Sequence, residues 1–456
     1  MKKHSLLLLI IIALITFTQF SCNTTGPGPT RDVELSVSDV SCTEAWLNLT
    51  VNNLTSNTKV QLVRNSSVVN TINITSHDTT LYDDSLSPNK TYNYQVIELQ
   101  NGTAAAKSEM ITAKTMDTTS NNFTWQFYIL GNYLTGNSSK LYDIAIINDT
   151  DAWAVGEIYE NDSTGTYNSE HWNGLSWRPL KIMFPLCDTS GNIQNSWTYP
   201  TRGIFAISFN NIWFCSGGSL AHWNGKNFEE MCMSLGYGNR NLTRLWGNNN
   251  QIYLTGTNGF IAQYSNNIWQ NTKTGTTEDL FDIYSNDGKT IYASGGNFNT
   301  YDGVLLKGEN NRWQIVNEGK IINPNELFHP YFAGLAKTVW VSNTNTVYFG
   351  GNLLYRYKFG QYQLMKSLQG NYINGDVNGE YFGFISQVRG TADNDIFLVG
   401  EGNTIRHFNG VRWQQLGMPY NYSSSYTWLS LSVKNNLVIV VGYSSTNAII
   451  MKIKRE

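Results

Sequence analysis

A four-residue signature recurs seven times in the C-terminal three quarters of the chain, and it constrains the fold more than any other feature. Each copy follows a polar turn and runs from an aromatic or large apolar residue to a glycine. The copies are Trp153–Gly156, Trp213–Gly217, Tyr253–Gly256, Tyr292–Gly295, Tyr348–Gly351, Phe397–Gly400 and Ile439–Gly442. The distance from one copy to the next defines a repeat of about 40–60 residues. A repeat of that length does not bury a core alone, so the repeats are expected to stack against one another.

A second element follows several copies and predicts further strands. It is an Asn-Gly turn that usually ends near a tryptophan, as in His171-Trp172-Asn173-Gly174 before Trp177. Asn-Gly between alternating runs is the strongest short hairpin signal, because both central residues need positive φ. Four short strands per repeat indicate propeller blades. The last repeat lacks a fourth strand, and the unpaired run Phe123–Ile129 before the first repeat can supply it.

These features resemble bacterial propeller repeats of the "IWAVG…HWNG..W" kind over residues 123–456. The resemblance implies a β-propeller of seven blades. It says almost nothing about activity, because one fold hosts many functions.

The N-terminus has the layout of an export signal. Lys2 and Lys3 precede an apolar run, and Ser21 stands before Cys22. The run is too short to span a bilayer, and its charge pattern is typical of a signal peptide. The segment resembles the lipobox of bacterial lipoproteins, although Gln19 departs from the usual leucine. It implies a signal peptide over 1–21, lipidation of Cys22, and a flexible tether over 22–31. An ordinary signal peptide is the alternative.

Residues 32–116 alternate apolar and polar positions in short runs, as in an antiparallel sandwich. The runs predicted as strands are Leu35–Val40, Ala45–Val51, Val60–Arg64, Val68–Ile74, Thr91–Leu99 and Glu109–Lys114. The segment resembles a fibronectin type III domain, with Trp46 at the core position. Leu86-Ser87-Pro88 followed by Tyr92, Tyr94 and Val96 matches the run that contains the tyrosine corner. The resemblance implies a spacer domain, followed by a linker over 117–122. The fold class is therefore all-β, an immunoglobulin-like sandwich followed by a propeller.

Composition excludes several classes of partner. Charged residues make up 14% of the chain against 13% aromatic, and the formal net charge is −3. Without clusters of Lys and Arg, such a chain is a poor candidate for binding nucleic acid. We expect a monomer attached to a membrane through its lipid, at the outer membrane or cell surface, with the periplasmic face as an alternative.

The sequence predicts no catalytic residue, metal or cofactor. His171, His222 and His407 occupy equivalent places in different repeats, so they are expected to point apart and to be structural. Acidic pairs such as Asp149 and Asp151 precede a signature copy, where turns favour Asp. No nucleophile elbow, phosphate loop or zinc motif is present.

Insertions between the strands are expected to crowd one rim of the propeller, and they are rich in aromatic residues. Exposed aromatics on scaffolded loops are typical of binding surfaces, although packing between the loops is the alternative. Those chosen as ligand-binding candidates are Tyr159, Tyr167, Trp197, Tyr199, Tyr237, Tyr301, Tyr331, Tyr372, Tyr381 and Tyr420, and Phe298 and Tyr422 belong to the same set. Cys187 and Cys232 lie in consecutive insertions and are the predicted disulfide. Cys42 and Cys215 are expected in strands as buried thiols.

Three functions remain open at this point. The first is a binding protein whose loop face recognises a glycan or a protein. The second is a carbohydrate-active enzyme, either a glycoside hydrolase or a glycosyltransferase-like protein, that uses rim carboxylates as acid and base. Those carboxylates are Glu157, Glu160, Asp162, Asp302, Asp376 and Glu380. The third is a structural scaffold of an envelope complex.

Overall fold

The computed structural model of the chain describes residues 33–52, 54, 58–131, 137–160, 165–188, 190–233, 241–318, 328–329, 332–365, 384–416 and 426–456. These residues are all-β. Cys22, the signal peptide and the tether lie outside them, as do Tyr237, Tyr331, Tyr372, Tyr381, Tyr420 and Tyr422. Within the described ranges, no helix has the length and apolarity needed to cross a membrane.

Contacts divide the chain into two compact units. One comprises residues up to 36, 48–79 and 94–111, and the other comprises 37–47, 80–93 and 112–456.

Residues 33–114 form eight strands in two sheets. The strands are β1 (Val33–Val40), β2 (Ala45–Val51), β3 (Thr58–Arg64), β4 (Ser67–Ile74), β5 (Asp78–Asp83), β6 (Thr91–Gln100), β7 (Thr103–Lys107) and β8 (Ile111–Lys114). One sheet has the order β1-β2-β5, and the other β4-β3-β6-β7 with β8 also paired to β6. The sequence predicted neither β5 nor β7. Cys42 is a buried free thiol but lies in a bend before β2, so its predicted place in a strand is wrong.

The remaining strands form a series of antiparallel sheets, each built from consecutive strands. The first sheet contains β10 (Lys140–Asn148), β11 (Asp151–Tyr159), β12 (Thr166–Trp172) and β13 (Trp177–Leu180). The second contains β16 (Gly203–Ser208), β17 (Asn211–Ser216), β18 (Ser219–Trp223) and β19 (Phe228–Cys232). The third contains β20 (Leu242–Gly247), β21 (Ile252–Gly256), β22 (Phe260–Ser265) and β23 (Ile268–Thr272). A separate hairpin, β14 (Phe184–Cys187) and β15 (Ile193–Trp197), lies between the first and second sheets in sequence.

Four more sheets complete the series. The fourth contains β24 (Asp279–Tyr284), β25 (Thr290–Gly296), β26 (Gly303–Glu309) and β27 (Arg312–Glu318), and the fifth contains β29 (Ala336–Val341), β30 (Val347–Gly351), β31 (Leu354–Lys358) and β32 (Gln361–Leu364), with β28 (Phe328–His329) added at the outer edge. The sixth contains β33 (Ile385–Ala392), β34 (Asp395–Gly400), β35 (Ile405–Phe408) and β36 (Trp413–Gln415). The seventh contains β37 (Tyr426–Lys434), β38 (Leu437–Ser444), β39 (Asn447–Arg455) and β9 (Phe123–Leu130).

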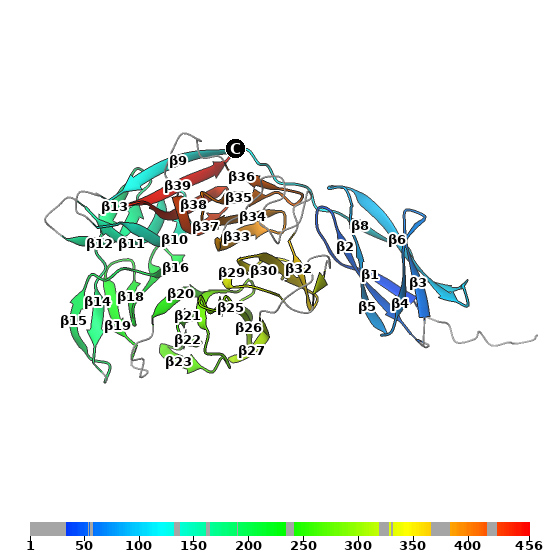
Figure 1. Cartoon of the computed structure of the whole chain (residues 1–456), viewed down its shortest axis with the longest axis horizontal. Helices are drawn as coiled ribbons and strands as arrows, with labels where there is room; N and C mark the ends of the chain where they lie inside the picture. The colour runs from blue at the N-terminus through cyan, green and yellow to red at the C-terminus, as the bar shows by residue number, and fades with distance from the viewer. Residues whose placement is uncertain are drawn as a thin grey trace, which may run out of the picture. The chain divides into compact units, whose positions relative to one another are not determined.

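The sheets form a closed ring. The first strand of each sheet contacts the first strand of the next, and β37 contacts β10. Strand β9 pairs antiparallel with β39 along its whole length, from Phe123 opposite Arg455 to Leu130 opposite Ala448. Figure 1 shows β9 in cyan beside β39 in red, the two ends of the ring in one sheet. The prediction that the run before the first repeat closes the last sheet is confirmed.

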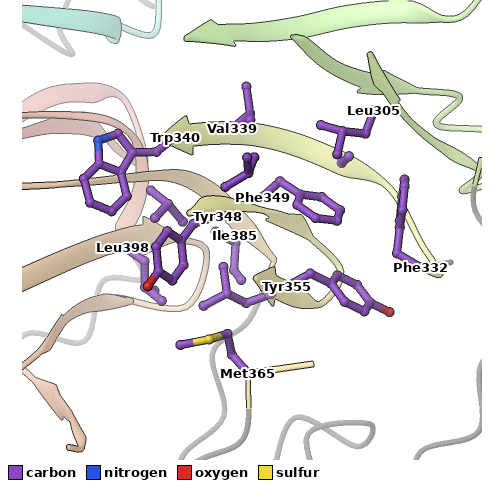
Figure 2. Close-up of a cluster of buried hydrophobic side chains, with 14 of the residues drawn as sticks. Leu305, Phe332, Val339, Trp340, Tyr348, Phe349, Tyr355, Met365, Ile385 and Leu398 are labelled. Carbon is purple, nitrogen blue, oxygen red and sulfur yellow. The ribbon is translucent and has the colours of Figure 1, made fainter. Parts of the chain in front are cut away.

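The core lies between neighbouring sheets. In Figure 2, Trp340, Tyr348, Phe349 and Tyr355 pack together with Leu305 from the preceding sheet. Leu398 from the following sheet completes the same cluster. The seven signature copies lie on the second strand of each sheet, so their aromatic residues supply this intersheet packing.

Candidate binding site at the mouth of the central channel

Six of the seven signature glycines accept a close backbone approach from the start of the first strand of their own sheet, and Gly217 is the exception. A Cβ on Gly156 would meet the carbonyl oxygen of Lys140 at 2.0 Å, and one on Gly400 would meet that of Phe384 at 2.0 Å. Gly442 faces the Thr427 oxygen at the same distance. Glycine is therefore required here because any side chain would clash with backbone.

Next to each such glycine, the first strand contains a β-bulge. In six sheets the pairing register skips one residue at this point, as between Leu141 and Asp143 or between Ala336 and Thr338. The skipped residues are Tyr142, Thr243, Phe281, Lys337, Ser386 and Leu429. A bulge leaves one residue without a partner and turns it away from the ladder.

The sheet that begins with β16 has no such register shift but has an equivalent residue. Gly203 pairs with Cys215 as Asp143 pairs with Val155, so the residue before it, Arg202, takes the place of Tyr142. Its backbone N–H donates to the Cys215 carbonyl at 2.8 Å. We call this set the mouth residues: Tyr142, Arg202, Thr243, Phe281, Lys337, Ser386 and Leu429.

All seven mouth residues line one cavity of about 1000 Å³, the mouth cavity. Arg244, Tyr199, Asp188 and the Gly217-Gly218 turn also line it. Because every mouth residue lies near the start of a first strand, the cavity opens at the end of the ring where those strands begin. A volume of this size is ample for a peptide segment or a small molecule.

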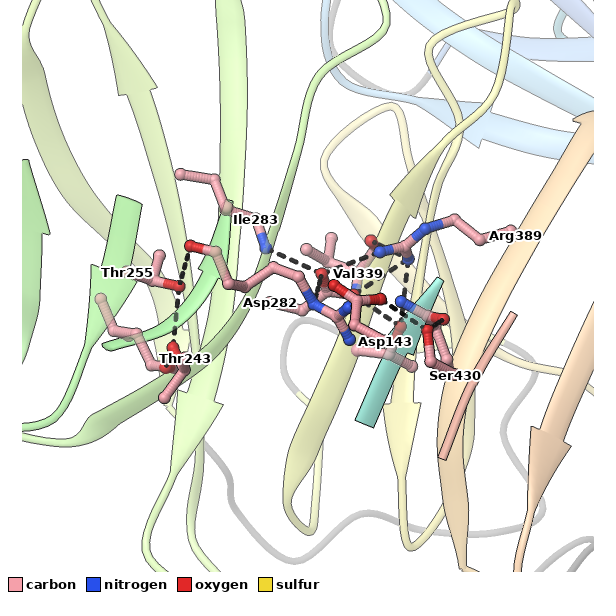
Figure 3. A network of polar contacts seen from close by, with 12 residues as sticks. Asp143, Thr243, Thr255, Asp282, Ile283, Val339, Arg389 and Ser430 are labelled. Carbon is pink, nitrogen blue, oxygen red and sulfur yellow. Dashed lines mark hydrogen bonds and ion pairs between the residues drawn. The ribbon is translucent and has the colours of Figure 1, made fainter. Parts of the chain in front are cut away.

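The residue after each bulge is polar, and these six residues form a layer beneath the cavity: Asp143, Arg244, Asp282, Thr338, Gln387 and Ser430. Together with Arg389, which bonds to Asp282, they make up the channel network. Figure 3 shows Asp282 between Val339 and Arg389, with Ser430 beside Asp143. Asp282 accepts from the Thr338 hydroxyl at 2.8 Å and from both terminal nitrogens of Arg389 at 2.9 Å. These contacts link strands that are distant in sequence.

At several places the network connects neighbouring sheets in the same manner, with a side chain of one sheet accepting from a backbone N–H of the next. The Asp143 carboxylate accepts a hydrogen bond from the backbone N–H of Ile204. In the same way, the Thr338 hydroxyl accepts one from Val388, and the Gln387 side-chain oxygen accepts one from Leu431. Burial opposes ionisation of Asp282, but the charges of Arg389 and Arg244 overcome it and lower its pKa. A second cavity of about 180 Å³ lies beyond the network, and Arg244 lines both cavities.

Two mouth residues are cations held against aromatic rings. The Arg202 guanidinium lies 4.1 Å from the ring centroid of Tyr142, and the Lys337 ammonium lies 4.3 Å from that of Phe281. Burial, and then the nearby charge of Arg244, lowers the pKa of Lys337 to about 8. Lys337 is therefore mostly charged at pH 7.

The wall of the mouth cavity beside the second sheet is the β14–β15 hairpin. Cys187 of β14 and Cys232 of β19 form a disulfide with a Cα–Cα distance of 5.7 Å, the pair predicted from their neighbouring insertions. Ser219 also donates to the Pro185 carbonyl at 2.6 Å. The hairpin is thus attached to β18 and β19 at two points.

The predicted rim aromatics that lie in described residues have different surroundings. Tyr199 lines the mouth cavity and is 40% exposed, and Trp197 on β15 is 56% exposed. Phe298 packs on Phe281 at 5.0 Å, which brings it to the mouth. Tyr301 is exposed in the β25–β26 connection. Tyr167 lies on β12 rather than in a loop, and it packs against the core of the first sheet.

Of the rim carboxylates proposed for catalysis, the three in described residues, Glu157, Glu160 and Asp302, do not line the mouth cavity. Glu157 accepts a short hydrogen bond from the Tyr142 hydroxyl, and burial, then Glu157, raises the pKa of Tyr159. Glu160 lies near Glu170, which is buried. Burial, and then the charge of Glu160, raises the pKa of Glu170 to about 8. Asp302 is exposed, and Asp162, Asp376 and Glu380 lie outside the described residues.

The three repeat histidines have structural partners. His171 bonds to Asp151 at 2.9 Å, His222 to Asn211 at 3.0 Å, and His407 to Asp395 at 2.8 Å. In each case the partner begins the second strand of the same sheet. The described residues contain no group of three or more His, Cys, Asp or Glu placed to hold a metal.

Comparison with solved structures identifies the architecture. The structure "YCF48 bound to D1 peptide" matches with a TM-score of 0.50 and 11% identity, over 73% of this chain and 95% of that one. YCF48 is a β-propeller. The C-terminal ring is β-propeller-like. YCF48 from Cyanidioschyzon merolae also matches, with a TM-score of 0.45 and 11% identity over 72% of this chain and 98% of that one. At this identity the likeness concerns the fold alone.

No protein-family model matches the chain, and no curated protein matches it in sequence.

Sequence reasoning missed the mouth residues, although a positional signal was available. Each lies ten or eleven residues before the aromatic residue of its own signature copy. Their chemical types differ from one repeat to the next, so no residue pattern identifies them. Only the shared offset does.

Proposed function

We propose that this chain is a binding protein of the bacterial cell envelope, and that its propeller binds a segment of another protein at the mouth cavity. The observation that supports it is the convergence of all seven mouth residues on one cavity of about 1000 Å³. Six of these residues lie at bulges, outside the ladder pairing of their sheets.

The surroundings of the cavity fit a polypeptide better than a small molecule. Exposed Trp197 and Tyr199 extend its wall on the disulfide-fixed hairpin, and aromatic residues of this kind dominate protein interfaces. The similarly folded YCF48 structure is described as bound to D1 peptide. This precedent supports a peptide ligand for the fold without naming one for this chain.

The rest of the chain serves as an anchor and a spacer in this proposal. The ring comprises seven blades, and residues 32–116 form a fibronectin type III domain. The sheet orders β1-β2-β5 and β4-β3-β6-β7 support that assignment, as does the Ser87 N–H that donates to the Tyr92 hydroxyl at 2.8 Å. Acylated Cys22 attaches the protein to the outer membrane, where it faces the cell surface or the periplasm.

Site-specific photo-crosslinking in cells tests the binding face. A benzoylphenylalanine at Tyr199 should crosslink to a polypeptide, whereas the same residue at Phe209 should not. Phe209 is 65% exposed but lies in the β16–β17 turn at the opposite end of the ring. Equal crosslinking at both positions refutes the proposed face, and crosslinks to carbohydrate alone would assign a glycan ligand instead.

The anchor is tested separately. Labelled palmitate should enter the full chain but not a Cys22→Ala variant, and that variant should leave the membrane fraction. A Cys22→Ala protein that remains at the membrane would contradict the anchor and leave the binding site untouched.

A further inference from the structure

The mouth contains the same cation–aromatic arrangement twice. In each case an aromatic mouth residue of one sheet supports a cationic mouth residue of the next. The Arg202 guanidinium lies 4.1 Å from the ring centroid of Tyr142, and the Lys337 ammonium lies 4.3 Å from the ring centroid of Phe281. Phe298 adds a second ring 5.8 Å from the Lys337 ammonium. An aromatic face attracts a cation without neutralising its charge.

These two cations differ from the cations of the channel network. Arg389 is paired with Asp282, and Arg244 forms ion pairs with both Asp143 and Asp282. In the described part of the chain, neither Arg202 nor Lys337 forms an ion pair with a carboxylate. Their positive charges are therefore available to an anion in the cavity.

The position of the two pairs in the ring places them on opposite sides of the mouth. Arg202 belongs to the second sheet of the series and Lys337 to the fifth, so two sheets separate them along one arc and three along the other. A ligand that crosses the mouth can contact both.

The charged lining of the cavity is biased towards cations. Arg202, Arg244 and Lys337 line it, against Asp188 alone. Asp188 is already engaged, because it accepts hydrogen bonds from the backbone of Ser190 and Asn192 and from the side chains of Asn192 and Gln194. Since Arg244 is ion-paired as well, Arg202 and Lys337 are the cations of the described lining that have no carboxylate partner.

We propose that the mouth cavity selects for carboxylates, supplied by acidic side chains or by the C-terminus of the bound polypeptide, and that Arg202 and Lys337 are the residues that bind them. This inference rests on the proposed function and specifies its ligand chemistry. Desolvation inside a cavity strengthens such charge-assisted hydrogen bonds.

Peptide selection on the full chain in detergent tests the inference. Random short peptides on beads are offered in two sets, one with a free C-terminal carboxylate and one with an amidated C-terminus. Retained peptides should be enriched in Asp and Glu if side chains are the source, and confined to the free set if the terminus is the source. Either pattern supports the proposal.

Variants then assign the effect to residues. Lys337→Met and Arg202→Met should each weaken binding of a selected peptide by roughly 10- to 100-fold, the loss of one charged hydrogen bond. Lys337→Arg should retain most of the affinity. Lys434→Met is the matched control, because Lys434 is exposed at the last position of β37, at the other end of the ring. Unfolding midpoints check that each variant is folded.

The remaining outcomes separate the two proposals. Peptides retained without enrichment in acids or free termini, or with affinity unchanged by both methionine variants, would overturn the carboxylate assignment and leave the proposed function standing. Retention of acidic glycans but no peptides, together with no polypeptide crosslink at Tyr199, would overturn both.

Discussion

Asp282 is the residue whose charge the ring most depends on, and Asp282→Asn should destabilise the propeller strongly. The carboxylate is buried and accepts five hydrogen bonds from strands β24, β29 and β33. The Arg244 Nε atom lies 3.4 Å away. An amide would leave Arg389 and Arg244 short of an anion and would turn an NH₂ group towards their own donors.

We expect the free energy of unfolding to fall by about 3–5 kcal/mol, the cost of removing one partner from a buried ion pair. The measurement is urea denaturation followed by tryptophan fluorescence. Asp149→Asn is the control, because Asp149 is exposed and its nearest cation, Lys454, is 3.9 Å away. That change should stay within about 0.5 kcal/mol.

The pH dependence of the loss has a defined sign. The pKa of Asp282 is lower in the folded chain than in the unfolded one, because Arg389 and Arg244 outweigh burial. The stability it contributes is therefore present above the unfolded value of about 3.9 and is lost as pH falls through the folded value. The gap between wild type and Asp282→Asn should close over that acid range.

A double-mutant cycle with Arg389→Met decides whether charge is the cause. If the amide is harmful because it strands Arg389, the double variant should recover part of the loss. A loss below about 1 kcal/mol for Asp282→Asn, or strictly additive effects in the cycle, would refute the view that this network stabilises the ring.

Three further predictions follow from other parts of the ring. Replacing Cys187 and Cys232 together by serine should cost about 4 kcal/mol by loop-closure entropy for their sequence separation of 45, and reductant should lower the midpoint of the wild type but not of the variant. Gly442→Ala should lower the unfolding free energy by about 1–3 kcal/mol, since its Cβ would meet the Thr427 oxygen at 2.0 Å, and an unchanged midpoint would argue against the bulge geometry. Binding of an acidic peptide should weaken as pH rises through about 8, where Lys337 beside Arg244 and Asp282 loses its charge, and Lys337→Arg should abolish that dependence in a fluorescence titration.

Features that depend on local pattern were predictable from the sequence. The signature glycines, the closing strand β9 and the Cys187–Cys232 pair all follow from repetition and spacing. Strands β5 and β7 were missed because runs such as Asp78–Asp83 and Thr103–Lys107 are short and have few large apolar residues, so alternation gives no signal. Tertiary pairing decides such strands.

The candidate site was predictable only in part, because it depends on register. Tyr199 and Trp197 could be found as aromatic residues on an insertion; Tyr199 lines the cavity, and Trp197 is exposed on β15 of the neighbouring hairpin. Lys337 and Arg202 could not, since a lone cation in an otherwise apolar strand gives no indication that a bulge turns it into a cavity.

Two adjacent residues near the start of each first strand have different roles in this ring. One contributes to stability, and the other to ligand specificity. The residue after the bulge meets the neighbouring sheet, and there the chain keeps groups that satisfy one another, such as Asp143, Asp282, Gln387 and Ser430. The mouth residue itself meets the cavity, and there the residue type differs from sheet to sheet, being Tyr, Arg, Thr, Phe, Lys, Ser or Leu. A substitution at a mouth residue should therefore change what is bound at little cost in stability, whereas one at its neighbour should do the reverse. The contrast between Lys337→Met and Asp282→Asn measures that separation directly.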